Sequence, residues 1–188
     1  MKSDYLKWND ALKIIELLKK DSTFQSTQYL AFFSLGVFSG LRIGDILKLR
    51  YCDIKPTIKV QEEKTKKKRD ITISQDVINL INQCKVDLVK SDYDFVVPIG
   101  SQQCSNVLKK LASRIGIFDL SISNHTMRKT FSRAIWENNG STDSALVKLS
   151  EILNHSNIST TRKYLGIRDE EIEDCYRSLS LKPIKKKK

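Results

Sequence analysis

Apolar residues recur at helical spacing along most of this 188-residue chain, and that periodicity limits which folds are open to it. One stretch breaks the pattern, because Ile58 and Val60 alternate with polar residues, as do Ile71 and Ile73. Alternation on both sides of a polar, lysine-rich segment is typical of a β-hairpin. We therefore expect one α+β domain that is mostly α-helical and contains a small antiparallel β-sheet.

The expected helices lie on both sides of this hairpin. Asn9 is a plausible N-cap of the first apolar stripe, Gly40 a good stop for the second helix, and a third helix begins near Arg42. A short strand at residues 95–97 ends at Pro98, which gives the sheet about three strands. The first two helices are expected at residues 11–18 and 27–39, and the later ones at 75–90, 101–115, 125–138, 144–153 and 169–180.

The chain is strongly basic, with a formal net charge of +11 and a pI near 9.5. The last four residues are lysines, and without them the charge is still +7 (11 − 4). Such an excess implies an acidic polymer as partner, with nucleic acid the first choice and an anionic membrane surface the second. We expect residues 181–188 to form a solvated, disordered basic tail that adds non-specific attraction to phosphate.

Targeting signals and cysteine usage favour a cytoplasmic protein. Residues 1–6 lead into charged residues rather than into the apolar run of a secretory signal. The longest apolar stretch, residues 29–38, is about 10 residues long and too short to span a bilayer, so we expect a buried helix there and no membrane contact. The cysteines are scattered, without a CxxC pair, which suits a reducing compartment and disfavours structural zinc; they are Cys52, Cys84, Cys104 and Cys175.

The chain has only two histidines, and each lies near an arginine or a tyrosine. His125 stands three residues before Arg128, His155 stands nine residues before Tyr164, and Arg42 lies far upstream. Arginine binds phosphate oxygens bidentately, histidine exchanges protons near neutral pH, and tyrosine can act as an oxygen nucleophile. This set of side chains fits the cutting and rejoining of a nucleic-acid backbone.

Opening a phosphodiester bond requires a nucleophile, neutralisation of the non-bridging oxygens and a proton for the leaving oxygen. Metal-dependent nucleases use clustered carboxylates for this, but Glu62 and Glu63 lie among lysines, and the acids at 169–171 resemble a helix start. We therefore expect no metal and no other cofactor. Arg42 and Arg128 are the candidate cations.

Three segments resemble the three sequence boxes of the tyrosine recombinases, the phage integrase family. They are GLRIGDILKL at residues 40–49, HTMRKTF at 125–131 and LSEILNHSNISTTRKY at 149–164. The likeness spans nearly the whole chain in matching order and spacing. It implies the tyrosine recombinase catalytic-domain fold and site-specific DNA breakage and rejoining, without ATP or metal, for integration or excision of a mobile element.

The resemblance also implies a role for each candidate residue. Tyr164 would attack the scissile phosphate, form a covalent 3′-phosphotyrosine link and release a 5′-hydroxyl. Arg42 and Arg128 would clamp the non-bridging oxygens. His125 would accept the proton of the nucleophile, and His155 would hydrogen-bond to the phosphate.

Two further roles rest on position. Lys64, just after the first strand of the hairpin, would protonate the leaving oxygen, although the lysines at 66–68 compete for that role. Asp45 lies one helical turn after Arg42 and would either orient it or act as a capping or salt-bridging acid.

The implied partner is double-stranded DNA, with no small-molecule substrate. Residues 1–180 would form the catalytic domain, and the N-terminal DNA-clamp domain usual in the family would be absent. A C-terminal amphipathic helix would either dock on a neighbouring protomer in a homo-tetramer on DNA or pack on its own core. Its apolar residues are Ile167, Ile172, Cys175, Tyr176 and Leu179.

Two other functions remain open. A non-catalytic DNA-binding module could share the fold, but binding alone does not need a nucleophile. A type IB topoisomerase-like enzyme would share the chemistry, but the small size of the chain disfavours it. A rolling-circle relaxase is excluded, since it needs a histidine-rich metal site that two histidines 30 residues apart do not supply.

Overall fold

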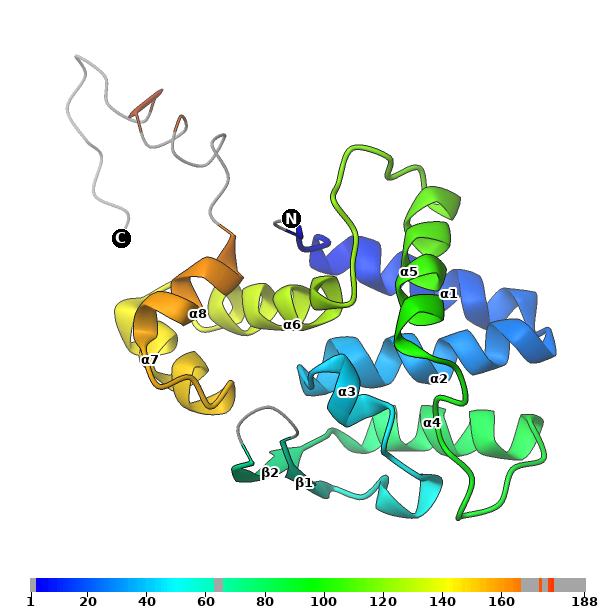
Figure 1. Cartoon of the computed structure of the whole chain (residues 1–188). Helices are drawn as coiled ribbons and strands as arrows, with labels where there is room; N and C mark the ends of the chain where they lie inside the picture. The colour runs from blue at the N-terminus through cyan, green and yellow to red at the C-terminus, as the bar shows by residue number, and fades with distance from the viewer. Residues whose placement is uncertain (1–2, 63–65, 167–172, 174–175, 178–188) are drawn as a thin grey trace.

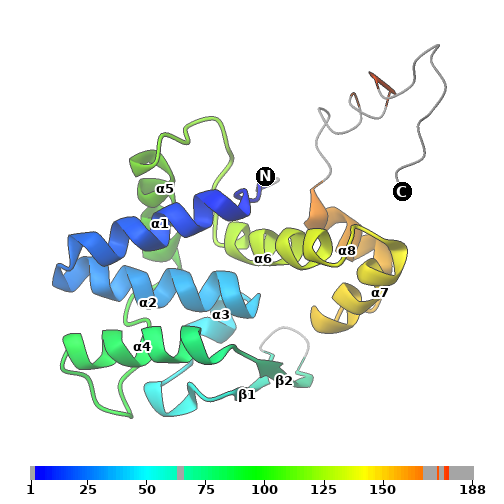
Figure 2. The same ribbon diagram turned by 180° about the vertical axis from the view of Figure 1, so that it is seen from behind.

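Helix α2 (Phe24–Ser39) lies at the centre of a computed structural model that describes residues 3–62, 66–166, 173 and 176–177. This helix is apolar on nearly all sides, and Phe32, Phe33 and Leu35 are almost fully buried. A helix that is hydrophobic all round is stable only when other elements cover every face. Helices α1 (Trp8–Asp21), α4 (Gln75–Asp87) and α6 (His125–Asn138) supply that cover. Figures 1 and 2 show α1, α2 and α4 side by side in one layer.

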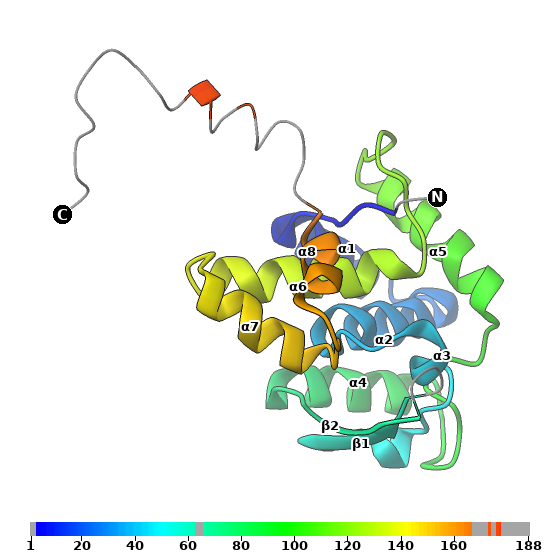
Figure 3. The same ribbon diagram turned by 60° about the vertical axis from the view of Figure 1, so that its left-hand side comes forward.

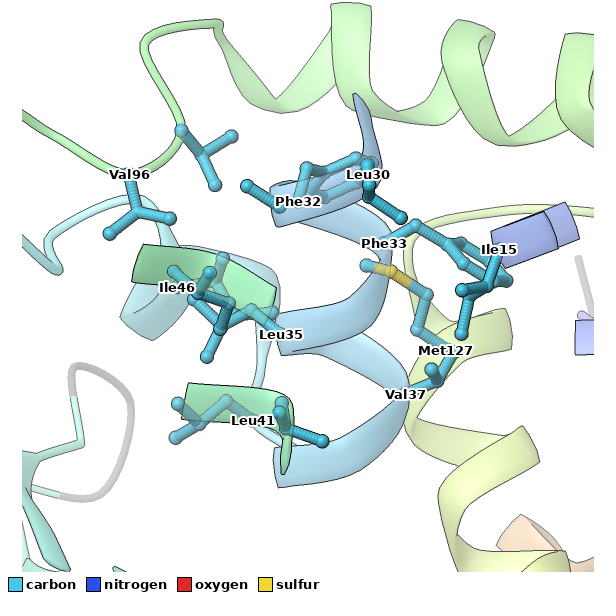
Figure 4. Packing of buried hydrophobic residues seen from close by; sticks show 14 of the residues in the cluster. Ile15, Leu30, Phe32, Phe33, Leu35, Val37, Leu41, Ile46, Val96 and Met127 are labelled. Atoms are coloured by element: carbon cyan, nitrogen blue, oxygen red, sulfur yellow. The ribbon is translucent and has the colours of Figure 1, made fainter. Parts of the chain in front are cut away.

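The contact between α2 and α6 is close because α2 has a glycine there. A β-carbon at Gly36 would overlap the sulfur of Met127, which is 1% exposed on α6. Figure 4 shows Met127 among Ile15, Phe33 and Val37, so that α1, α2 and α6 share one hydrophobic core. This packing fixes the start of α6 relative to the end of α2.

The predicted hairpin is confirmed, whereas the predicted third strand is wrong. Strands β1 (Thr57–Gln61) and β2 (Lys68–Thr72) pair antiparallel, with Ile58 opposite Ile71. Within the described part of the chain the sheet has these two strands, and Phe95 forms only an isolated bridge to Arg50. Pairing stops there because the chain turns just before it, where the Ser91 amide donates to the Asp94 carboxylate, and Pro98 just after it has no N–H.

A second, smaller core joins α7 (Asp143–Ile152) and α8 (Ile158–Leu165) to α6. Figure 3 shows these two helices against the outer part of α6, with the hairpin below them. The cluster consists of Leu146, Leu149, Leu153 and Leu165, with Phe131, Ile135 and Trp136 of α6 packed against it.

Shorter elements complete the fold. Helix α3 (Ile43–Ile46) follows α2 after a turn at Gly40, and the 3₁₀ helix η1 (Tyr51–Asp53) leads into the hairpin. Helix α5 (Ser101–Arg114) packs its buried face into the large core. Before α1, the Lys129 ammonium donates to the carbonyl of Ser3, which ties the N-terminal segment to α6.

Most of the predicted helices are confirmed to within a few residues. Asn9 is not the N-cap of the first helix: α1 begins at Trp8, and Lys7 occupies the N-cap position without a side-chain cap. Helix α8 was not predicted. The predicted helix at 169–180 and the basic tail at 181–188 lie outside the described residues, apart from positions 173, 176 and 177. Among the described residues, no helix combines the length and the apolar character that crossing a bilayer requires.

Candidate active site

Arg128 is buried at the start of α6 and joins three parts of the chain. Its side chain is 1% exposed, Nη1 donates to the carbonyl of Gly40 at 2.6 Å, and Nη2 donates to the carbonyl of Leu153 at 2.8 Å. Burial, and then the nearby charge of Arg42, lowers the pKa of Arg128 to about 10. Arg128 therefore stays charged at neutral pH. Its Nε has no hydrogen-bond partner among the described residues.

Three of the other predicted residues surround the same point. The ring of Tyr164, half-buried on α8, lies 5.0 Å from the ring of His155 and 6.5 Å from the ring of His125, measured between centroids. The Cζ atom of Arg128 lies 5.6 Å from the centroid of the Tyr164 ring. The first turn of α6, the turn after α7 and helix α8 thus bring two histidines and an arginine around one tyrosine.

His155 is neutral and is held at both ring nitrogens. Its Nδ1 lies 3.0 Å from the hydroxyl oxygen of Thr161, and its Nε2 lies 3.4 Å from Nη2 of Arg128. Since a guanidinium can only donate, Nε2 must accept, and we assign the ring proton to Nδ1, which donates to Thr161. Burial, and then the charge of Arg128, lowers the pKa of His155 to about 4.

Arg42 reaches the site from the N-cap position of α3. Its side chain is 19% exposed, and its Nη1 lies 2.7 Å from Oε1 of Glu62. This contact is an ion pair, but the N–H bonds of Arg42 Nη1 are not aligned for a hydrogen bond to the carboxylate. Arg42 also lines a pocket of about 220 Å³ between the starts of α3 and α6, together with Asp45, His125 and Arg128.

Glu62 is a site residue that the sequence analysis missed. Its side chain is 0% exposed, and besides Arg42 it contacts Nη1 of Arg69 at 3.1 Å and accepts from Nδ2 of Asn154 at 3.4 Å. Because Glu62 stands next to several lysines, the sequence analysis did not assign it to the site. The apolar alternation of the hairpin, however, indicated that its side chain faces inward. Glu62 continues the inward-facing alternation of Ile58 and Val60.

Arg69 was missed for the same reason and carries the same signal. It continues the inward-facing positions of β2, where Ile71 is buried, and it pairs across the sheet with Val60. Its side chain is 9% exposed. Burial lowers the pKa of Arg69, while the charge of Glu62 acts in the opposite direction.

The roles predicted for Asp45 and Lys64 stay predictions. Asp45 is 2% exposed, and its backbone N–H donates to the carbonyl of Arg42 at 2.9 Å. Arg42 pairs with the carboxylate of Glu62. Orientation of Arg42 by the Asp45 side chain stays a prediction. Lys64 lies outside the described residues. Across that gap, the Lys66 amide donates to the carbonyl of Glu62 at 2.9 Å, so both ends of the Lys64 segment lie at the edge of the site.

Comparison with known proteins agrees with this arrangement. The model of the phage integrase family matches residues 4–171. A probable integrase/recombinase, YoeC of Bacillus subtilis, is 33% identical over 152 residues, which cover 77% of this chain and 81% of that protein. The tyrosine recombinase XerC of Nitrobacter winogradskyi is 29% identical over 152 residues, covering 74% of this chain but only 46% of the relative.

Solved structures share the fold. A crystal structure of the XerA recombinase superposes with a TM-score of 0.71 at 21% identity, covering 92% of this chain and 62% of that one. The XerH site-specific recombinase bound to its difH substrate in a pre-cleavage complex gives a TM-score of 0.69 at 17% identity, covering 93% of this chain and 54% of that one. The chain belongs to the phage integrase family, the tyrosine-type site-specific recombinases, and has their catalytic-domain fold.

Proposed function

We propose that this chain breaks and rejoins double-stranded DNA at a defined site through a covalent 3′-phosphotyrosine intermediate. One observation carries the proposal: His125, Arg128 and His155 converge on the ring of Tyr164. The relatives support DNA as the partner, since XerH and a lambda integrase dimer were both solved bound to DNA. The basic charge of the chain fits a polyanionic partner.

In the cleavage step, the hydroxyl oxygen of Tyr164 attacks phosphorus and the bond from phosphorus to the 5′-oxygen breaks. The tyrosine proton passes to His125. Lys64 donates a proton to the leaving oxygen, which thereby becomes a 5′-hydroxyl. Arg42 and Arg128 neutralise the non-bridging oxygens as charge builds on them. One preorganised donor of this kind contributes about 3–4 kcal/mol of transition-state stabilisation.

His155 needs a proton on Nε2 before it can donate to a phosphate. In the structure Nε2 accepts from Arg128, and Nδ1 donates to Thr161. The hydroxyl of Thr161 can donate as well as accept, so it can satisfy Nδ1 when the proton moves to Nε2. A phosphate beside the ring favours that state, because its negative charge stabilises a positive or donating imidazole.

Rejoining reverses these steps. A 5′-hydroxyl attacks the phosphotyrosine, the strand is resealed, and Tyr164 recovers its proton. The phosphotyrosine link conserves the energy of the broken bond, so the reaction needs no ATP. We also expect it to proceed in EDTA, because the cations proposed here are arginines.

Assembly and setting extend the proposal. The lambda integrase dimer on DNA supports a complex of several copies, and we propose a tetramer joined by the C-terminal helix, whose residues lie almost wholly outside the described part. Integration or excision of a mobile element in the cytoplasm is the proposed setting. We propose that residues 1–180 form the catalytic domain and that residues 181–188 attract phosphate groups non-specifically.

The test uses a library of nicked duplexes whose central sequence is randomised. A nick near the cleavage position releases a short fragment and traps the covalent intermediate. We expect protein–DNA adducts that survive denaturation, and sequencing their DNA gives the target site. Absence of adducts despite DNA binding would favour the non-catalytic module. Relaxation of a plasmid without the selected site would favour the topoisomerase-like activity.

A further inference from the structure

We infer that Glu62 is a positioning residue that holds Arg42 in the orientation needed to bind the scissile phosphate. The inference rests on the proposed function and adds a residue that none of the three sequence boxes contains. Glu62 is the last described residue of the hairpin before Lys64, and it points into the site rather than into solvent.

The contacts of Glu62 join three separate parts of the site. Oε1 contacts Arg42, which begins α3, and Arg69, which lies on β2. Oε2 accepts from Asn154, the residue before His155. A single carboxylate thus links the first box, the hairpin and the turn that carries His155. Moving it would shift Arg42 relative to Arg128 and His155.

The charges around Glu62 explain why a carboxylate is needed at this position. Arg42 and Arg69 lie close enough to Arg128 that their charges lower its pKa. The charge of Glu62 raises the pKa of Arg128. The same opposition acts on Arg69, where Glu62 favours the charged form and Arg42 disfavours it. Without the buried carboxylate, Arg42 would be repelled by the other two guanidinium groups before any phosphate arrived.

Glu62 also anchors the ends of the segment that contains Lys64. Its backbone N–H donates to the carbonyl of Lys67 at 3.0 Å, and its carbonyl accepts from the amide of Lys66 at 2.9 Å. The residue that holds Arg42 is therefore the residue at which that segment leaves β1. Glu62 therefore joins the hairpin to the first box.

The test compares Glu62→Gln, which keeps the shape and removes the charge, with the matched control Asp70→Asn. Asp70 is an exposed acid on β2, next in sequence to Arg69, so its change removes the same charge from the same hairpin. The substrate is the nicked duplex selected above, prepared with a normal scissile phosphate or with a methylphosphonate. A methylphosphonate has a methyl group in place of one non-bridging oxygen, so its cleavage depends less on arginine charge.

We expect Glu62→Gln to slow adduct formation about 100-fold on the normal phosphate, the size of effect that follows a misplacement of about 1 Å. On the methylphosphonate the same change should cost less than about tenfold, because a misplaced Arg42 matters less there. Asp70→Asn should match wild type on both substrates. Glu62→Asp, which keeps the charge but shortens the side chain, should show the same substrate-dependent loss and remain informative if Glu62→Gln does not fold.

An equal loss on both substrates would overturn the inference and make Glu62 a structural residue only. Wild-type rates for folded Glu62→Gln on the normal phosphate would overturn it as well. Failure of the wild-type chain to form any adduct is a separate result, which contradicts the proposed function itself. Circular dichroism and thermal melting identify which variants fold.

Discussion

Nδ1 of His155 lies 3.0 Å from the hydroxyl oxygen of Thr161, a fully buried residue one helical turn before Tyr164 on α8. The helix that presents the tyrosine therefore also orients a histidine from the preceding turn. A movement of α8 would displace both groups together. We therefore expect Tyr164, the proposed nucleophile, and His155, the proposed phosphate-binding histidine, to move together.

Thr161→Val tests this link, because it keeps the shape of the side chain and removes the hydroxyl. The buried Nδ1 would lose its partner, which costs about 1–3 kcal/mol. We expect adduct formation to slow by about 10- to 100-fold, the usual effect of removing a group that orients a functional histidine. Thr161→Ser keeps the hydroxyl and should stay within a few-fold of wild type. Equal rates for the valine and serine variants would contradict the link.

The low pKa of His155 predicts a pH dependence that NMR can follow. With only two histidines in the chain, each gives a resolvable ring signal, and that of His155 should titrate near pH 4, where burial and Arg128 have lowered its pKa. Addition of the selected duplex should raise the pKa, since the phosphate favours a proton on the ring. An unshifted His155 signal in the complex would argue against its contact with the phosphate.

The same shift affects stability in a defined direction. Between about pH 4 and pH 6.5 the unfolded chain binds a proton at His155 that the folded chain does not. This group therefore makes the free energy of unfolding increase with pH across that window and decrease on acidification. Urea denaturation at several pH values measures the slope, and His155→Gln should reduce it.

Tyr164→Phe should abolish adduct formation, because it removes the attacking oxygen. The fold should survive, since the ring stays in place beside His155. Tyr176→Phe and Tyr93→Phe are the matched controls, as both tyrosines are 75% exposed. Their adduct yields should equal that of wild type, and an adduct from Tyr164→Phe would assign the nucleophile to another residue.

Arg128→Gln should reduce both stability and activity. The carbonyls of Gly40 and Leu153 lose a charged donor in a buried place, so we expect unfolding to become easier by about 2–4 kcal/mol in urea denaturation. Adduct formation should fall roughly a thousandfold. Arg177→Gln serves as control, because that side chain is 74% exposed and its ion pair with Glu173 contributes little. If Arg128→Gln were as stable as wild type, the hydrogen bonds from Arg128 to Gly40 and Leu153 would not stabilise the fold.

Gly36→Ala should destabilise the fold without touching the site directly. A β-carbon there would overlap the sulfur of Met127, and overpacking of this kind costs about 1–3 kcal/mol. Gly100→Ala is the control, since nothing lies within 4 Å of its added β-carbon. A melting temperature of Gly36→Ala as high as that of Gly100→Ala would show that α2 and α6 can separate at little cost.

The sequence allowed the prediction of most of the fold, because helices and hairpin have different apolar periods. The prediction of a third strand was wrong because Phe95 and Val96 have strand-like side chains, but strand formation depends on the partner backbone. Here Phe95 forms an isolated bridge to Arg50, and Val96 donates to the carbonyl of Leu49, without a continuous ladder. Helix α8 escaped prediction because its run of serine and threonine is a weak helix former. It forms because Leu165 packs into the small core and Asn157 caps its start.

The structure brings together five of the six predicted site residues. They could be predicted because all five lie in the three sequence boxes that resemble the family. Glu62 and Arg69 were not found, because their burial depends on which face of the hairpin meets the rest of the molecule. The pattern of Ile58 and Val60 shows which residues share a face. It does not by itself show that the face continues past the apolar residues to a carboxylate.

The two hydrogen bonds of Arg128 also have a consequence for the order of folding. They connect residues 88 and 25 positions apart in sequence, from α6 back to the end of α2 and forward to the turn after α7. Closing long loops costs conformational entropy, and the bond to Leu153 cannot form until α7 and the turn after it have been synthesised. A chain still emerging from the ribosome therefore has no assembled cutting site. Under the proposed function, DNA cleavage would therefore require synthesis of the chain through α8, which carries Tyr164.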